Sequence, residues 1–249
     1  MTQSTAVSPP PYWLGLPLAI VIIALYLWSW LGLLQADIQQ MSGLMIVGAI
    51  ALRTFLHTGL FITAHDAIHG TICPRWPWLN HAIGAIAMFL YALFLYPIMR
   101  RQHLQHHQTP ATPEDPDYSP RWQDNAFLWY GAFIWRYLQG IHGWVVLGGM
   151  TLLLHSLHFV GHVAYPNLVI FWVIPNFLSS WQLFYFGIYL PHRQPPTPYP
   201  APHRSTTLNW TTIWSLLACY HFGYHWEHHE YPQVPWHQLP AYRTSNPSA

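Results

Sequence analysis

The sequence predicts an all-α integral membrane protein with four transmembrane helices, and two properties of the chain lead to this fold class. Hydrophobic residues make up 52% of the 249 residues and charged residues only 7%, whereas soluble domains carry about 25% charged residues. The chain also contains apolar runs long enough to cross a bilayer, which takes roughly 20 helical residues. Nine basic residues, all arginines, are balanced by eight acidic ones, which excludes a basic nucleic-acid-binding surface. We expect one membrane domain over residues 1–249.

Four apolar segments are expected to cross the membrane, at residues 13–34, 42–63, 144–160 and 168–190. Arg53 lies within the second segment and suggests that this helix leaves the hydrocarbon near it, because a charge is costly there. The run at 81–99 is of marginal length, and the run at 211–220 is too short to cross. Residues 110–120 are polar and acidic and residues 191–202 are rich in proline, so both are expected to be loops.

The most unusual feature of the composition is the presence of 18 histidines. An imidazole ring needs a polar partner or a metal ion where water is absent. Three clusters have the patterns HxxxH, HxxHH and HxxHH, in which residues three and four apart lie on one helix face. They consist of His65 and His69; His103, His106 and His107; and His225, His228 and His229. His221 would extend the last cluster by one helical turn.

These clusters can form one site only if they lie on the same side of the membrane. The chain between His69 and His103 must then cross twice or not at all, so we expect residues 81–99 to be an interfacial or re-entrant segment. Arginines gather on the cytoplasmic side of membrane proteins, and in this topology most of them lie with the clusters: Arg75, Arg100, Arg101, Arg121, Arg136, Arg193, Arg204 and Arg243. The sequence thus predicts a cytoplasmic histidine-rich cap with interfacial helices.

The clustered histidines are more numerous than the ligands of one metal ion, since zinc takes four, and the cap is expected to hold two ions. Imidazoles without thiolates suit iron, copper, nickel or zinc, and iron is the choice for dioxygen chemistry. Asp66 stands where the zinc-peptidase motif HExxH has its catalytic glutamate, which argues against a peptidase. Another histidine series lies in and beyond the third span and is interpreted as packing or interfacial: His155, His158 and His162.

Three longer segments carry a resemblance to a known family. They read FITAHDAIHG at 61–70, LFYFGIYLPH at 183–192 and CYHFGYHWEHHEYP at 219–232. These segments resemble the bacterial-type β-carotene ketolases, which belong to the membrane-bound fatty acid desaturase and hydroxylase superfamily. The similarity extends over most of residues 40–240, whereas the HxxHH pattern alone would indicate only the superfamily.

The resemblance implies a non-haem di-iron centre with two Fe²⁺ ions, dioxygen as the co-substrate and an external electron donor such as ferredoxin. The metal ligands would be His65, His69, His103, His106, His107, His192, His225, His228 and His229. His221 would be either a further ligand or a group that supports one. Asp117, with Asp115, matches an acidic pair of the family and would either orient an imidazole ring or be a solvated loop acid.

The implied activity is the introduction of a 4-keto group into the β-ionone rings of a carotenoid that resides in the bilayer. β-Carotene would be converted through echinenone to canthaxanthin by two successive C4 hydroxylations and dehydration. We expect a multi-pass protein of the inner or plasma membrane. The alternatives are a carotenoid ring hydroxylase, a lipid desaturase or hydroxylase, and a metal transporter without enzymatic activity. A transporter would need polar groups distributed through its spans, whereas these histidines gather at helix ends.

Overall fold

The computed structural model describes residues 12–243, and all regular secondary structure in this range is helical. The main helices are α1 (Gly15–Leu34), α2 (Gly43–Ile68), α3 (Pro77–Ala92), α4 (Tyr96–Gln108), α5 (Ala126–Tyr137), α6 (Gly140–Gly143), α7 (Gly149–Phe159), α8 (Tyr165–Leu168), α9 (Ile174–Phe184), α10 (Leu190–His192), α11 (Thr212–Cys219) and α12 (His225–Glu230). Short 3-10 helices are η1 (Tyr12–Leu14), η2 (Ile38–Gln40) and η6 (Trp236–Tyr242), and π-helical turns are η3 (Trp144–Gly148), η4 (Val169–Val173) and η5 (Tyr185–Tyr189). The predicted all-α class is confirmed.

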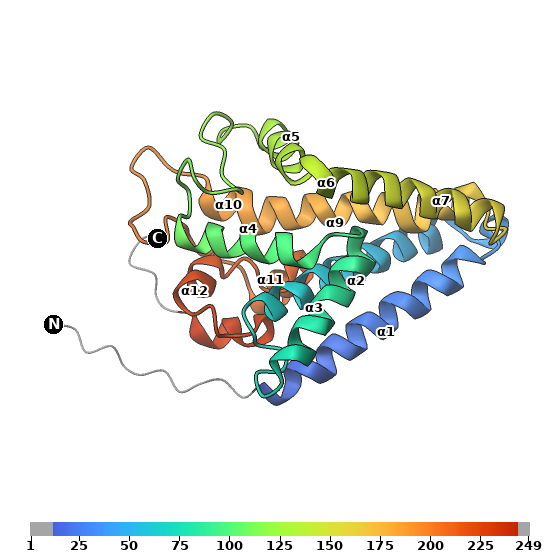
Figure 1. Ribbon diagram of the computed structural model, residues 1–249, viewed down its shortest axis with the longest axis horizontal. Helices are drawn as coiled ribbons and strands as arrows, with labels where there is room; N and C mark the ends of the chain where they lie inside the picture. Colours follow the sequence, from blue (N-terminus) through green and yellow to red (C-terminus); the bar gives the residue numbers. More distant parts are fainter. Residues whose placement is uncertain (1–11, 244–249) are drawn as a thin grey trace.

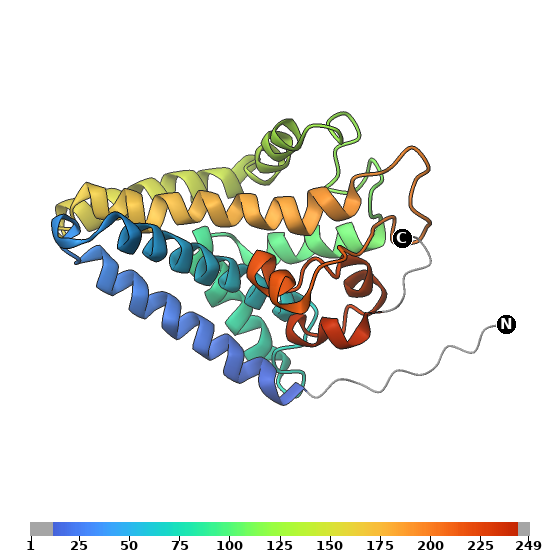
Figure 2. The same ribbon diagram turned by 180° about the vertical axis from the view of Figure 1, so that it is seen from behind.

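Four continuous helical segments are long and apolar enough to cross a membrane: Tyr12–Leu34, Gly43–Ile68, Gly140–Phe159 and Tyr165–His192. The π turn η3 joins α6 to α7, and the π turns η4 and η5 join α8, α9 and α10. Each of these two series of short helices therefore continues as one rod, called here the α6–α7 rod and the α8–α9 rod. The turns between α1 and α2 and between α7 and α8 lie at one end of the bundle (Figure 1). The red C-terminal segment with α11 and α12 lies at the opposite end in Figure 1 and, from behind, in Figure 2. The four-span fold class is therefore confirmed.

Helices α3 and α4 meet at a bend of 100°. Leu93 at the bend has a left-handed backbone conformation, with φ of 59°. The backbone groups released by the bend find side-chain partners, as buried irregular backbone requires within a membrane. His57 Nε2 lies 2.6 Å from the Tyr91 carbonyl oxygen, and Leu95 N–H donates to His142 Nε2 at 3.4 Å. The interfacial or re-entrant placement of residues 81–99 stays a prediction, and this bend is compatible with it.

Arg53 lies inside the bundle, whereas the sequence suggested that its helix would emerge near this residue. Helix α2 continues to Ile68, and the Arg53 side chain is fully buried. Its Nε donates to the Phe171 carbonyl at 3.1 Å and its Nη1 to the Tyr26 carbonyl at 2.8 Å. Pro175 has no N–H to offer to the Phe171 carbonyl four residues earlier. The arginine therefore supplies a donor that the α8–α9 rod lacks, and this role could not be read from the sequence.

The close packing of α2 against α3 depends on Gly84. A Cβ atom at Gly84 would lie 2.6 Å from Ala67 Cβ and 2.6 Å from Tyr96 Cε2. We expect Gly84→Ala to lower stability, because overpacking typically costs about 1–3 kcal/mol. The matched substitution Gly48→Ala on α2 meets no atom within 4 Å, and there alanine favours the helix by roughly 1 kcal/mol. The two variants should shift the thermal unfolding midpoint in detergent in opposite directions; shifts of the same sign would contradict this packing.

Candidate metal centre

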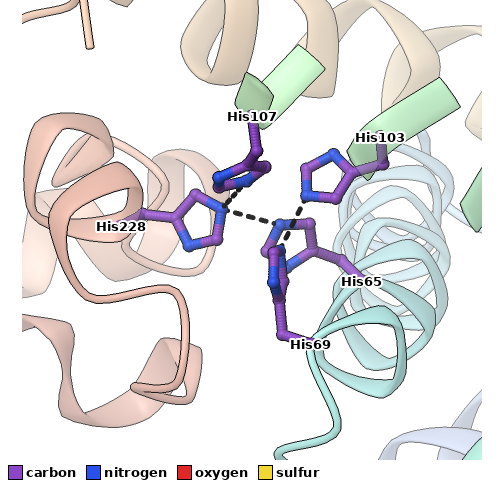
Figure 3. A group of neighbouring side chains, drawn as sticks. All are labelled: His65, His69, His103, His107 and His228. Carbon is purple, nitrogen blue, oxygen red and sulfur yellow. Dashed lines mark hydrogen bonds between the residues drawn. The ribbon is translucent and has the colours of Figure 1, made fainter. Parts of the chain in front are cut away.

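The first group of histidines lies where the end of α2 meets α4 and α12. Its five rings converge from these three segments (Figure 3), and one ring nitrogen of each lies within 4.8 Å of those of the others. The members are His65, His69, His103, His107 and His228. His228 Nε2 is 3.1 Å from His65 Nε2 and 2.9 Å from His107 Nε2. His69 and His103 face each other through Nε2 atoms 2.8 Å apart.

The second group lies beside the first and contains four buried histidines, His106, His192, His225 and His229. The Nε2 atom of His225 is 2.8 Å from that of His192 and 3.1 Å from that of His229. His106 Nε2 lies 3.1 Å from His229 Nε2. Helix α10 ends at His192, so the end of the last spanning segment places the His192 ring in this group.

The two HxxHH patterns are divided between the groups in opposite ways. On α4, His103 and His107 enter the first group and His106 enters the second; on α12, His225 and His229 enter the second and His228 enters the first. Residues four apart lie almost directly above one another on a helix, while the residue three positions on is offset around it. All nine histidines predicted as ligands lie in the two groups, but the sequence does not reveal this division.

The donor set fits metal cations. A neutral imidazole has one donor and one acceptor nitrogen, so several Nε2 atoms that meet at one point cannot all be satisfied by hydrogen bonds among themselves. Burial, together with the neighbouring imidazoles, holds the pKa values of His228 and His229 well below the usual 6.5. Burial lowers the pKa of His69 to about 3. These rings are therefore neutral at neutral pH and can offer lone pairs to a metal.

Two carboxylates support the second group from the loop after α4. Both Asp115 oxygens lie 3.0 Å from His106 Nδ1. Burial acts to raise the pKa of Asp115, but His106 opposes it and the net pKa is lowered. Asp117 accepts a hydrogen bond from the Tyr137 hydroxyl at 2.5 Å, and burial raises its pKa to about 6. Both side chains are buried, so neither is the solvated loop acid that the sequence left open.

We expect Asp115→Asn to weaken metal binding, because the carboxylate fixes the His106 ring and makes its Nε2 a better electron-pair donor. Loss of such a partner typically costs 10–100-fold in metal affinity. The comparison is Glu114→Gln, which removes the same charge one residue away at an exposed position. Chelator-competition titration of both purified variants measures the effect. Equal affinities for the two variants would show that Asp115 does not support a ligand.

His221 is not brought into either group. Helix α11 ends at Cys219, Tyr220 and His221 have left-handed φ values of 46° and 66°, and α12 begins only at His225. The four-residue spacing to His225 is therefore not helical. The His221 ring instead stacks near Trp236, with centroids 6.1 Å apart.

The histidines near the end of the third span lie at the opposite end of the bundle from the two groups. His155 Nδ1 is 3.0 Å from the Tyr165 hydroxyl, and His158 Nδ1 is 2.9 Å from the Val163 carbonyl oxygen. These contacts tie α7 to the turn that follows it. They agree with the interpretation of this series as packing residues.

Two side chains near the groups were not singled out in the sequence. Tyr137 on α5 donates to Asp117, as described above. His203 lies in the proline-rich loop, with its ring centroid 5.8 Å from that of His229 and its Nε2 2.7 Å from a Glu230 oxygen. Neither residue belongs to a helical pattern of histidines, so no spacing signal could have found them.

Both groups border one apolar cavity of about 70 Å³, called here the inner cavity. His65 and His103 of the first group and His106 and His225 of the second form part of its wall. The rest of the lining is mainly apolar, as with Phe61, Met88, Leu183 and Phe222. A metal-bound reactant would thus face a hydrocarbon-like compartment rather than water.

The four candidate spans and the paired histidine groups define a helical integral membrane protein with a metal-binding cap. Residues 41–246 match the model of the fatty acid desaturase family, and the chain belongs to this family. It is 39% identical over 232 residues to the β-carotene ketolase of Paracoccus sp. (strain PC1), a match that covers 92% of this chain and 91% of that protein.

Two algal relatives extend the comparison. The β-carotene ketolase of Haematococcus lacustris is 36% identical over 224 residues, which cover 86% of this chain and 68% of that protein. The zeaxanthin 4-ketolase of Chlamydomonas reinhardtii is 33% identical over 249 residues, which cover 92% of this chain and 53% of that protein. These matches confirm the resemblance found in the sequence and identify the chain as an oxidoreductase.

Proposed function

We propose that this protein is a di-iron carotenoid ketolase that introduces a keto group at C4 of β-ionone rings. The observation that carries the proposal is the joint approach of two histidine groups to one apolar cavity, in a chain similar to a β-carotene ketolase over nearly its whole length. A carotenoid is a hydrocarbon of the bilayer interior. An oxidising site reached through apolar walls suits such a substrate.

The nine grouped histidines would hold two iron ions, five rings on one side and four on the other. Two iron ions bound there would supply the activation of dioxygen. Each hydroxylation at C4 consumes one dioxygen, two electrons and two protons and yields the alcohol and water. A second hydroxylation at the same carbon gives a geminal diol, which loses water to leave the ketone. The apolar lining of the inner cavity would exclude bulk water from the site.

The electron donor in this proposal is a soluble ferredoxin-like protein that meets the cap from the cytoplasm. The arginine distribution supports this orientation, because most arginines lie in segments at the histidine end and positive charge is retained on the cytoplasmic side. His69, His103 and His107 of the first group are only partly buried. A soluble donor could therefore approach the first group more closely than the second, and electrons would enter through the first group.

Expression in a β-carotene-producing cell, followed by pigment chromatography, tests the function. The mono-ketone echinenone should appear before the diketone canthaxanthin, because the two rings of one carotenoid are too far apart to react without release. A 4-hydroxy species should be only transient. Hydroxylated carotenoids as end products would favour the ring-hydroxylase alternative, and unchanged carotenoids with altered lipids would favour a lipid desaturase. Diketone that accumulates with no mono-ketone would contradict release between the rings.

A further inference from the structure

A second cavity, called here the groove, lies between α5, the α6–α7 rod and the α8–α9 rod. Its volume is about 450 Å³. Leu147 and Phe177 belong to its lining and are 57% and 68% exposed. Both stand on segments that are long enough to cross the membrane. The groove therefore opens sideways into the hydrocarbon and not towards water.

The groove and the inner cavity lie next to each other and share a wall. Five residues line both spaces and are called here the neck: Tyr91, Phe94, Ile134, Tyr137 and Ser180. They come from the α3–α4 bend, from α5 and from α9. The side chains of the neck are thus all that separates the groove from the cavity that both histidine groups border.

The groove has the chemistry and the length for an apolar chain. No charged residue is among those that line it. Three of its polar side chains have partners in the protein, since the Tyr130 hydroxyl donates to Ser180 Oγ at 3.0 Å and Asn176 Nδ2 to the Tyr91 carbonyl at 3.3 Å. An apolar ligand would therefore leave these groups paired. Along the α8–α9 rod the lining runs from Ser180 in α9 back to Trp172 in η4, which corresponds to about 12 Å of helix.

We propose that the groove is the binding site for the polyene chain of the substrate, and that the side chains of the neck move apart to let one end ring reach the histidine groups. The movement is required because the inner cavity of about 70 Å³ is smaller than the roughly 150 Å³ that holds a benzene ring. The inference rests on the proposed function, because the occupant is the chain attached to the ring that is oxidised. The shared wall with the inner cavity favours this occupant over a bulk membrane lipid, because the chain attached to the oxidised ring must lie beside the histidine groups. The second ring then stays in the bilayer while the first reacts.

Filling the groove tests the proposal. Thr151 on α7 lines the groove, whereas its neighbour Leu152 is 69% exposed and does not line it. Thr151→Trp should lower kcat/KM for β-carotene about tenfold or more, since misplacement of the reacting carbon by even 1 Å can cost about 100-fold. Leu152→Trp, the same bulk one residue away, should leave kcat/KM close to that of the unchanged protein.

A second substrate separates a blocked groove from a damaged fold. The probe carries the same β-ionone ring on a side chain of only a few carbons, which need not extend along the groove as far as Thr151. We expect Thr151→Trp to oxidise this probe at the normal rate and to retain its full metal content. Equal losses on the long and the short substrate, or an unchanged rate on β-carotene, would overturn the proposal.

Two further outcomes are informative. If Thr151→Trp does not insert, Val173→Trp on the opposite wall of the groove provides the same comparison. If the unchanged protein forms no ketone from either substrate, the proposed function itself fails. A different result would be an active protein in which Thr151→Trp and Val173→Trp change the rates on the long and the short substrate equally. That result would refute only the role of the groove.

Discussion

His228→Ala is expected to abolish ketone formation while the protein still inserts into the membrane. The His228 Nε2 atom lies 3.1 Å from His65 Nε2 and 2.9 Å from His107 Nε2, and so contacts a ring from each of the other two segments of the first group. The substitution removes the one imidazole that α12 contributes to this group. We expect the same loss for His65→Ala and, in the second group, for His106→Ala. The measurement is pigment chromatography at matched expression of each variant.

The control is His158→Ala, which removes an imidazole of the same size from the opposite end of the bundle. His158 contacts the Val163 carbonyl and no member of either group. Its loss should leave catalysis largely intact. Substantial activity in any one of the three ligand variants would count against a single centre built from both groups, and inactivity of a well-folded His158→Ala would contradict the placement of the third span.

Removal of metal should abolish activity, and iron alone should restore it. We expect two metal ions per chain, because nine histidines divide into groups of five and four and one ion cannot accept so many ligands. Purified protein can carry zinc, since zinc stands above Fe²⁺ in the affinity order for nitrogen ligands. Chelation followed by reloading with iron or zinc, with metal analysis at each stage, separates binding from turnover. One ion per chain, or turnover with zinc alone, would defeat this prediction.

Much of the fold could be predicted from the sequence because each spanning helix is a long and mainly apolar run. The gathering of the clustered histidines could be predicted for a similar reason: their helical spacing brings the rings of each cluster to neighbouring positions on one helix. His192 is different, since no spacing marks it as a ligand. Only the resemblance of its flanking segment to the ketolases pointed to it.

What the sequence could not provide depends on contacts between distant segments. The division of the two HxxHH patterns is set by the relative rotation of α4 and α12, which no local pattern encodes. Helical spacing was wrongly extended to His221, because the left-handed residues at 220 and 221 interrupt the helix. The burial of Arg53 follows from a carbonyl that lies 118 residues further along the chain. Each of these features belongs to a pair of elements and not to one element.

The sharing of α4 and α12 between the two groups has a consequence for the order of metal uptake. An ion in either group fixes the same two helices against each other and so orders ligands that the other group also needs. The conformational entropy lost in this ordering is lost once, at the first binding event, and the second ion then binds to an arranged site. Uptake should therefore be positively cooperative, with singly loaded chains a minor species at every metal concentration. A metal titration followed by native mass spectrometry would show mainly chains with no ion and chains with two ions, and few chains with one.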